Sequence, residues 1–186
     1  MYEVEVKVRA DHEPVREALR RRDATPVGAV EQADRYFDAP HRDFAERDEA
    51  LRLRLESDAD GDAAPESKLA YKGPLVESES KTREEIETPV VSPTDVEAIL
   101  EALGFEVAAT VEKHRERWRV GEYVVSLDDV SGLGQFVEVE GKATKVTVPD
   151  VRDGALEVLR DLDLDPDEQI RTSYLGLLLG GSGAGE

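Results

Sequence analysis

The side chains best suited to chemistry lie at the start of the chain, where charged and apolar residues alternate. In residues 2–9, Glu3, Glu5 and Lys7 fall on one side of an extended chain and apolar residues fall on the other. Successive side chains of a β-strand point to opposite faces, so this period of two predicts a strand with one charged face. Carboxylates and an ammonium group on a shared face can bind a metal cation or an anion.

The same alternation returns in later segments of the chain. These are Arg52 and Arg54 within 51–55, Lys113, Arg115 and Arg117 within 113–117, and Glu138 and Glu140 within 137–140. Strands with charges of both signs on one face and Val or Leu on the other predict a closed barrel with a charged lumen. We therefore expect an α+β fold: about eight antiparallel strands closed into a charged tunnel, with helices packed on the outside.

The remaining elements are predicted from periodicity and from turn residues. Strands are expected at 27–37, 50–57, 67–72 (broken by Gly73-Pro74), 82–90, 107–119, 122–130 and 135–141, with a short one at 144–148. Helices are expected at 11–22, 92–104, 149–162 and 169–179. Residues 76–81 are predicted to form a mobile loop. The chain is expected to be a single domain over 1–179, followed by a flexible Gly-rich tail at 180–186.

The ordered set of these segments resembles the CYTH superfamily, the triphosphate tunnel metalloenzymes. Glu3-x-Glu5-x-Lys7 resembles the superfamily's N-terminal signature. Later segments resemble its class IV adenylate cyclase branch, with thiamine triphosphatase-like relatives. They are 34–38 (DRYFD), 50–54 (ALRLR), 71–74 (YKGP), 80–85 (SKTREE), 113–115 (KHR), 127–130 (LDDV) and 134–140 (GQFVEVE).

The resemblance implies a role for each charged residue. Hard carboxylate oxygens suit Mg²⁺ or Mn²⁺, and Arg and Lys suit the phosphates of a triphosphate. The implied metal residues are Glu3, Glu5, Asp128, Glu138 and Glu140. The implied triphosphate-binding residues are Lys7, Arg52, Arg54, Lys72, Arg83, Lys113 and Arg115. Lys81, Arg117 and Glu87 flank these motifs and are left outside the set.

The resemblance favours a cyclase that converts ATP into 3′,5′-cyclic AMP and pyrophosphate. The alternative is a hydrolase acting on inorganic triphosphate, thiamine triphosphate or a nucleoside triphosphate. In some relatives a Tyr–Lys pair is proposed to activate water, which here would be Tyr36 and Lys72, although Tyr36 suits a core position equally. A His-Phe-Arg-Pro segment associated with some cyclases has no match. A polyphosphate-binding module without catalysis is a third hypothesis.

A purely structural explanation of the charged residues remains open. The alternating charges would also form a ladder of buried ion pairs in an empty barrel, although such ladders often stabilise no better than apolar packing. His41 and His114 are candidate general bases, but the ring of His114 is expected to point away from Lys113 and Arg115.

The amino-acid composition of the chain limits which binding partners and which cellular compartment we expect. A formal net charge of −19 in 186 residues disfavours nucleic acid and predicts an acidic, hydrated surface suited to a salt-rich, halophilic cytoplasm. Cysteine is absent, which excludes disulfides, thiolate nucleophiles and cysteine-bound zinc. No apolar run reaches the roughly 20 residues of a membrane span. We expect a cytoplasmic protein with a small triphosphate substrate, and family members often form homodimers.

Overall fold

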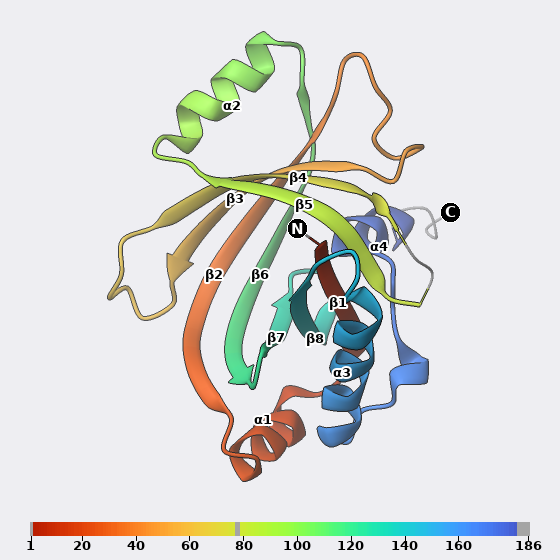
Figure 1. The fold of residues 1–186 in the computed structure, drawn as a ribbon. Coiled ribbons are helices and arrows are strands. Elements are labelled where there is room, and N and C mark those ends of the chain that lie inside the picture. The colour runs from red at the N-terminus through yellow and green to blue at the C-terminus, as the bar shows by residue number, and fades with distance from the viewer. Residues whose placement is uncertain (1, 77–78, 182–186) are drawn as a thin grey trace.

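The fold is a closed β-barrel with helices on its outer surface (Figure 1). A computed structural model describes residues 2–76 and 79–181. The strands are β1 (Tyr2–Arg9), β2 (Thr25–Asp38), β3 (Ala50–Asp58), β4 (Glu66–Leu75), β5 (Lys81–Pro89), β6 (Glu106–Val120), β7 (Tyr123–Val130) and β8 (Gly134–Ala143). Around the barrel they follow the order β1-β5-β4-β3-β2-β6-β7-β8, and every neighbouring pair is antiparallel. The predicted architecture is confirmed.

Strand register places the charged faces inside the barrel. In the pairing of β1 with β8, Glu5 lies opposite Glu140 and Lys7 lies opposite Glu138. The apolar faces of the same strands point outward, where Val6 and Val139 are fully buried under helices. A shift of one residue would exchange the two faces, so burial of the apolar face fixes the register.

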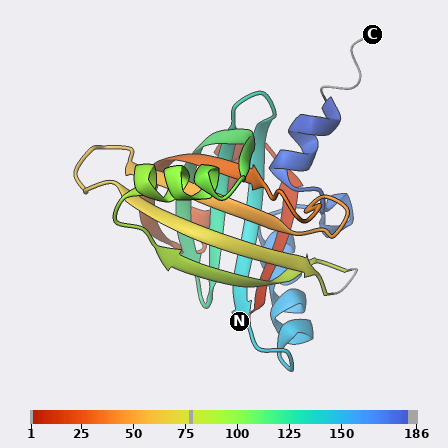
Figure 2. The same cartoon turned by 90° about the horizontal axis from the view of Figure 1, so that it is seen from above.

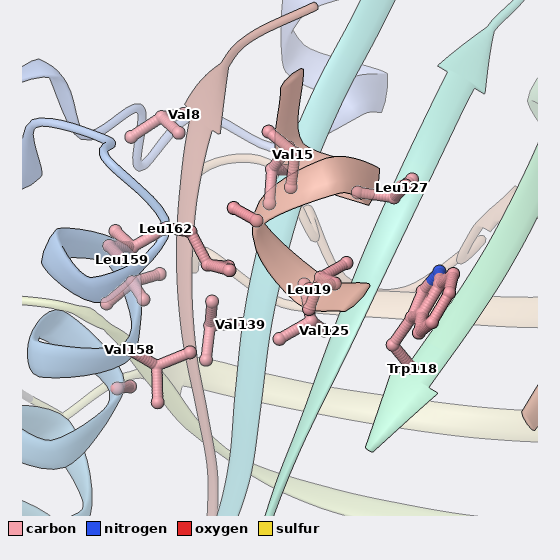
Figure 3. Packing of buried hydrophobic residues seen from close by; sticks show 14 residues of the cluster. Val8, Val15, Leu19, Trp118, Val125, Leu127, Val139, Val158, Leu159 and Leu162 are labelled. Atoms are coloured by element: carbon pink, nitrogen blue, oxygen red, sulfur yellow. The ribbon is translucent and has the colours of Figure 1, made fainter. Parts of the chain in front are cut away.

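Two helices bury the outer face of β1, β7 and β8. These are α1 (His12–Arg21) and α3 (Val148–Asp161). Figure 3 shows Val15 and Leu19 of α1 and Val158 and Leu159 of α3 among the packed side chains, which also include Trp118. This cluster holds the largest group of buried apolar residues and supports the strand that carries Glu3, Glu5 and Lys7.

The opposite side of the barrel carries α2 (Pro93–Ala102), which Figure 2 shows lying across the strands. Ser92 caps this helix, because its side chain accepts a hydrogen bond from the backbone N–H of Asp95. The helix ends before Gly104, whose φ of +87° favours glycine. Leu100 of α2 packs in a cluster with Phe37 and Leu53.

The C-terminal segment completes the barrel wall beside β1. Only four residue pairs, from Tyr2–Glu84 to Glu5–Lys81, join β1 to β5. Past these pairs, the Lys7 carbonyl accepts a hydrogen bond of 2.7 Å from the backbone N–H of Ile170. The short 3₁₀ helix η1 (Pro166–Glu168) precedes this contact and α4 (Tyr174–Gly181) follows it. The segment around Ile170 therefore lies against β1.

Three predictions about individual strands and helices were wrong. Gly73-Pro74 does not end β4, which continues to Leu75, because a register shift between Lys72 and Leu75 absorbs the irregularity. The strand expected at 144–148 is absent from the structure: residues 144–147 form a turn, with the Thr147 N–H bonded to the Thr144 carbonyl, and Val148 begins α3. The helix expected at 169–179 is shorter and begins at Tyr174.

Two expectations fall partly outside the described residues. The loop predicted at 76–81 includes residues 77 and 78, which lie outside them, while Lys81 already belongs to β5. The predicted tail at 180–186 begins inside α4, which extends to Gly181, and residues 182–186 lie outside the described range. Among the helices that are described, none has the length and apolar character needed to cross a membrane.

Candidate active site in the barrel lumen

The barrel encloses a cavity of about 500 Å³, here called the lumen. This volume lies within the usual range of small-molecule sites, roughly 300–1,000 Å³. Of the residues predicted to form the site, the structure places eleven on its wall. They are Glu3, Glu5, Tyr36, Arg52, Arg54, Lys72, Arg83, Lys113, Arg115, Glu138 and Glu140.

The two remaining predicted residues lie just beneath the wall of the lumen. Lys7 is 1% exposed, with its Nζ 3.6 Å from Glu5 Oε1 and 3.8 Å from Glu138 Oε1. Burial and the charge of Lys81 lower the pKa of Lys7. Asp128 is fully buried, accepts a hydrogen bond of 2.6 Å from Arg115 Nε, and also accepts one of 2.8 Å from the Tyr174 hydroxyl.

Carboxylates gather on the side of the lumen formed by β1 and β8. The side chain of Glu138 is bound to Arg115, and that of Glu5 accepts a hydrogen bond of 2.9 Å from Lys81 Nζ. Glu140 makes no ion pair with any residue of the described chain. Burial and the nearby carboxylates, chiefly Glu3, raise the pKa of Glu140 to about 7. Glu140 therefore lies buried among other carboxylates, and its neutral, protonated form is favoured.

Basic residues line the rest of the lumen wall, on β3 to β6, with Asp34, Glu85 and Glu87 among them. Asp34 holds Arg54 in place: its carboxylate accepts a hydrogen bond of 2.6 Å from Arg54 Nε and one of 2.7 Å from Arg54 Nη2. Lys113 Nζ lies 3.4 Å from the same carboxylate, while burial and Arg115 lower the pKa of Lys113 to about 8. The fixed guanidinium forks can bind phosphate oxygens in a defined orientation.

Lys72 bridges the two sides of the lumen. Its Nζ donates hydrogen bonds of 3.0 Å to Glu3 and 2.8 Å to Glu85. Burial alone would raise the pKa of Glu3, but the ammonium group of Lys72 lowers it to about 2. In the described part of the chain no hydrogen bond joins Lys72 to Tyr36. A joint role of these two residues in activating water stays a prediction.

Several lumen residues were missed or set aside. Lys81, Glu87 and Arg117, which flank the motifs, all line the lumen. So do Asp34 and Glu85, which fall on the charged face of their strands and which strand alternation alone would have identified. Tyr174 enters from α4, and no pattern in the sequence distinguishes it from a residue of an ordinary apolar helix.

The histidines lie away from the lumen. His114 is on the outer face, as expected, with its Nδ1 2.7 Å from Glu31 Oε1. His41 is exposed and makes an edge contact with the ring of Phe105, at 6.0 Å between centroids. Neither ring lines the lumen.

The carboxylate side of the lumen fits a divalent cation by its chemistry. As the side chains stand, no group of three Asp, Glu or His residues in the described ranges is arranged to hold a metal ion. The oxygens of Glu3, Glu5 and Glu138 are engaged by Lys72, Lys81 and Arg115 instead. Hard oxygen donors are what a Mg²⁺ or Mn²⁺ site requires, and Glu140 makes no ion pair within the described residues that a metal ion would have to displace.

Comparisons with known proteins agree with this geometry. A protein of Methanocaldococcus jannaschii named "Putative adenylate cyclase" is 38% identical over 179 residues, covering 95% of this chain and 98% of that protein. A solved structure of a Pyrococcus horikoshii OT3 protein superimposes with a TM-score of 0.88 at 36% identity, over 96% of this chain and 99% of the other.

A more distant structure has the same fold. It is a Hippeastrum protein named as a "Putative adenylyl cyclase" and described as having a dominant triphosphatase activity. The two sequences are 18% identical, the TM-score is 0.67, and the match covers 97% of this chain and 95% of the other. The family model described as the CYTH domain matches residues 1–174. With nearly its whole length matched and its charged barrel in place, the chain belongs to the CYTH family.

Proposed function

We propose that the lumen binds the triphosphate of ATP together with Mg²⁺ or Mn²⁺ and forms 3′,5′-cyclic AMP and pyrophosphate. The observation that carries this proposal is a single cavity whose wall combines carboxylates of β1 and β8 with arginines and lysines of β3 to β6. Phosphoryl transfer depends on positioning and on neutralising phosphate charge, and such a cavity supplies both. The name of the M. jannaschii relative supports the cyclase reaction.

The triphosphate would bind through Arg52, Arg54, Lys72, Arg83, Lys113 and Arg115, with Lys7 beneath them. Most of these cations are already paired with carboxylates, for example Lys72 with Glu3 and Arg115 with Glu138. A bound phosphate would replace those carboxylates on the cations, so that binding exchanges one set of ion pairs for another. Such an exchange costs less than desolvating an unpaired anion, because the cations are already buried and oriented.

The divalent cation would be held by Glu3, Glu5, Glu138 and Glu140, with Asp128 orienting Arg115 from behind. A bound Mg²⁺ or Mn²⁺ would neutralise charge on the phosphate oxygens. In the cyclase reaction the ribose 3′-oxygen forms a bond to the α-phosphorus while the bond from that phosphorus to the bridging oxygen breaks. The arginines and lysines of the lumen would stabilise the pyrophosphate as it leaves.

Hydrolysis is the second candidate reaction. The residues that would hold the three phosphates serve attack by water equally well, and the Hippeastrum protein with this fold is described with a dominant triphosphatase activity. Inorganic triphosphate, thiamine triphosphate and nucleoside triphosphates are the candidate substrates. A binding module without catalysis ranks third, because anion binding alone is not helped by the excess carboxylates beside Glu140.

We place the enzyme in the cytoplasm, where ATP is available. The net charge of −19 supports a salt-rich interior and disfavours nucleic acid as a partner. A homodimer stays a prediction from the family resemblance.

Product analysis tests the proposal. The protein would be incubated in high salt with Mg²⁺ or Mn²⁺ and either ATP or inorganic triphosphate. Cyclic AMP and pyrophosphate from ATP are expected; orthophosphate would instead establish the hydrolase. Glu138→Gln should abolish turnover while Glu31→Gln, on the outer surface, should not. Equal activity of both variants would refute the assignment of the carboxylate side.

A further inference from the structure

Tyr174 is a buried aromatic residue to which the proposed reaction gives no role. It is the first residue of α4, is 6% exposed and lines the lumen. Its ring makes an edge contact with the ring of Phe136, with 5.0 Å between centroids, and its hydroxyl donates a hydrogen bond of 2.8 Å to Asp128. These two contacts fix the ring in one position.

Two lysines of the proposed triphosphate-binding set lie over this ring. Lys7 Nζ is 4.3 Å from the ring centroid and Lys113 Nζ is 5.2 Å from it. Both distances fall within the roughly 6 Å over which the face of an aromatic ring attracts an ammonium group. The attraction is stronger where water is excluded, and both lysines are buried, at 1% and 5% exposed.

The remaining neighbours of these two lysines support their charge only in part. Lys7 Nζ has no hydrogen-bond partner among the described residues, and the carboxylate oxygens of Glu5 and Glu138 are 3.6 and 3.8 Å away. Burial lowers the pKa of Lys7, and burial together with Arg115 lowers that of Lys113 to about 8. The aromatic face therefore stabilises two ammonium groups whose charged form burial disfavours.

A neutral ring and a carboxylate affect an incoming phosphate differently. A carboxylate that neutralises a lysine also repels the phosphate and must give up its place on the ammonium group, as proposed above for Glu3 on Lys72. An aromatic ring carries no net charge, so it stabilises the ammonium group without repelling the anion. It can therefore stay in contact with the lysines while a triphosphate is bound.

We propose that Tyr174 is a positioning residue for triphosphate binding, whose ring supports Lys7 and Lys113 and whose hydroxyl anchors that ring on Asp128. The proposal rests on the proposed triphosphate function and extends it to a residue of the C-terminal helix. Asp128 also accepts a hydrogen bond of 2.6 Å from Arg115, so the same carboxylate serves a third cation. Tyr174 itself would not bind phosphate and would act through these cations.

Binding of inorganic triphosphate tests this role. The full-length protein and its variants would be titrated in EDTA, so that the affinity reports on the cations without a metal ion. Tyr174→Leu keeps an apolar side chain but removes the aromatic face, and should weaken binding about tenfold, as expected for a buried cation–π contact. Tyr174→Phe keeps the face and removes only the hydroxyl, so it should weaken binding less, by about threefold.

A second substitution on α4 is the matched control. Leu177 packs against the same apolar cluster as Tyr174 but does not line the lumen. Leu177→Ala should lower the melting temperature without changing the affinity for triphosphate measured well below that temperature. Thermal unfolding of each variant establishes that it is folded during the titration. If Tyr174→Leu does not fold, Tyr174→Met takes its place, because methionine is apolar and adaptable and also lacks an aromatic face.

Three outcomes would overturn the proposal. Unchanged affinity after loss of the aromatic face would show that the lysines do not need the ring. Equal weakening by Tyr174→Phe would assign the effect to the hydroxyl alone. Equal weakening by Leu177→Ala would show that Tyr174 only supports the packing of α4. Failure of the triphosphate function itself is distinguishable, because Arg54→Ala would then leave the affinity unchanged as well.

Discussion

Replacement of Asp34 by asparagine tests whether the buried charges of the lumen hold one another in place. Asp34 is 1% exposed and accepts two hydrogen bonds from Arg54, with Lys113 Nζ 3.4 Å away. Burial alone would raise the pKa of Asp34, but Arg54 and Lys113 lower it well below its ordinary value. Asparagine has nearly the same shape, so the substitution removes the charge and leaves the volume unchanged.

The expected loss follows from the two cations left behind. Removing one partner of a buried ion pair commonly costs about 3–5 kcal/mol, because the remaining charge stays buried without compensation. For a domain of this size, 1 kcal/mol corresponds to roughly 2–4 °C in the melting temperature, so Asp34→Asn should lower it by roughly 6–20 °C. Inorganic triphosphate should recover part of this loss, because its phosphates bring negative charge back to Arg54 and Lys113.

Thermal unfolding with and without inorganic triphosphate in EDTA is the measurement. Asp161→Asn is the control, because Asp161 is 54% exposed and makes only a 3.4 Å ion pair with Arg22. Exposed pairs contribute about 0–1 kcal/mol, so this variant should unfold within a few degrees of the wild type. If Asp34→Asn behaved like Asp161→Asn, or if triphosphate raised its melting temperature no more than that of the wild type, the reasoning would be refuted.

Three further predictions concern other buried groups. The pKa of Glu140 is raised to about 7, so the folded protein retains a proton that the unfolded chain releases, and stability falls between about pH 4.5 and 7. In EDTA, Glu140→Gln should therefore be more stable than the wild type at pH 8, by up to about 3 kcal/mol, and equally stable near pH 4.5; equal stability at pH 8 would contradict this. Burial alone would raise the pKa of Glu56, but Arg117 lowers it to about 2, so the stability that Glu56 contributes is present above about pH 4.5 and is lost toward pH 2. The unfolding free energies of Glu56→Gln and the wild type should differ at pH 6 and converge near pH 2, whereas a constant difference would argue against the shift. Tyr174→Phe removes a buried hydrogen bond to Asp128 and should cost about 1–2 kcal/mol in denaturant unfolding; no loss would show that Asp128 does not need this donor.

Strand alternation was sufficient to predict the barrel and most of the lumen. Glu3 and Glu5 share a face with Lys7 in any extended conformation, and burial of the valines between them leaves only one side for the charges. The irregular features could not be predicted this way. Gly73-Pro74 reads as a strand end, but the bulge that accommodates it depends on the partner strand β5.

Contacts between distant segments could not be predicted from the sequence either. The packing of Tyr174 against Phe136 and its hydrogen bond to Asp128 require α4 to lie across the end of the barrel. Helix α4 is apolar along its length and shows no preferred buried face in its sequence, so nothing indicates which side meets the lumen.

The pairing of β1 with segments far along the sequence has a consequence for folding during synthesis. Strand β1 pairs with β8, which lies about 130 residues later in the sequence, and its Lys7 carbonyl accepts a hydrogen bond from the amide of Ile170. Such long separations between partners slow folding, since loop closure must precede most of the favourable contacts. Glu3 and Glu5 can meet Lys72 and Lys81 as soon as β4 and β5 have been made, but they can meet Glu138 and Glu140 only after β8 has been made. A nascent chain that has not yet reached β8 would therefore lack Glu138 and Glu140 on the carboxylate side of the lumen.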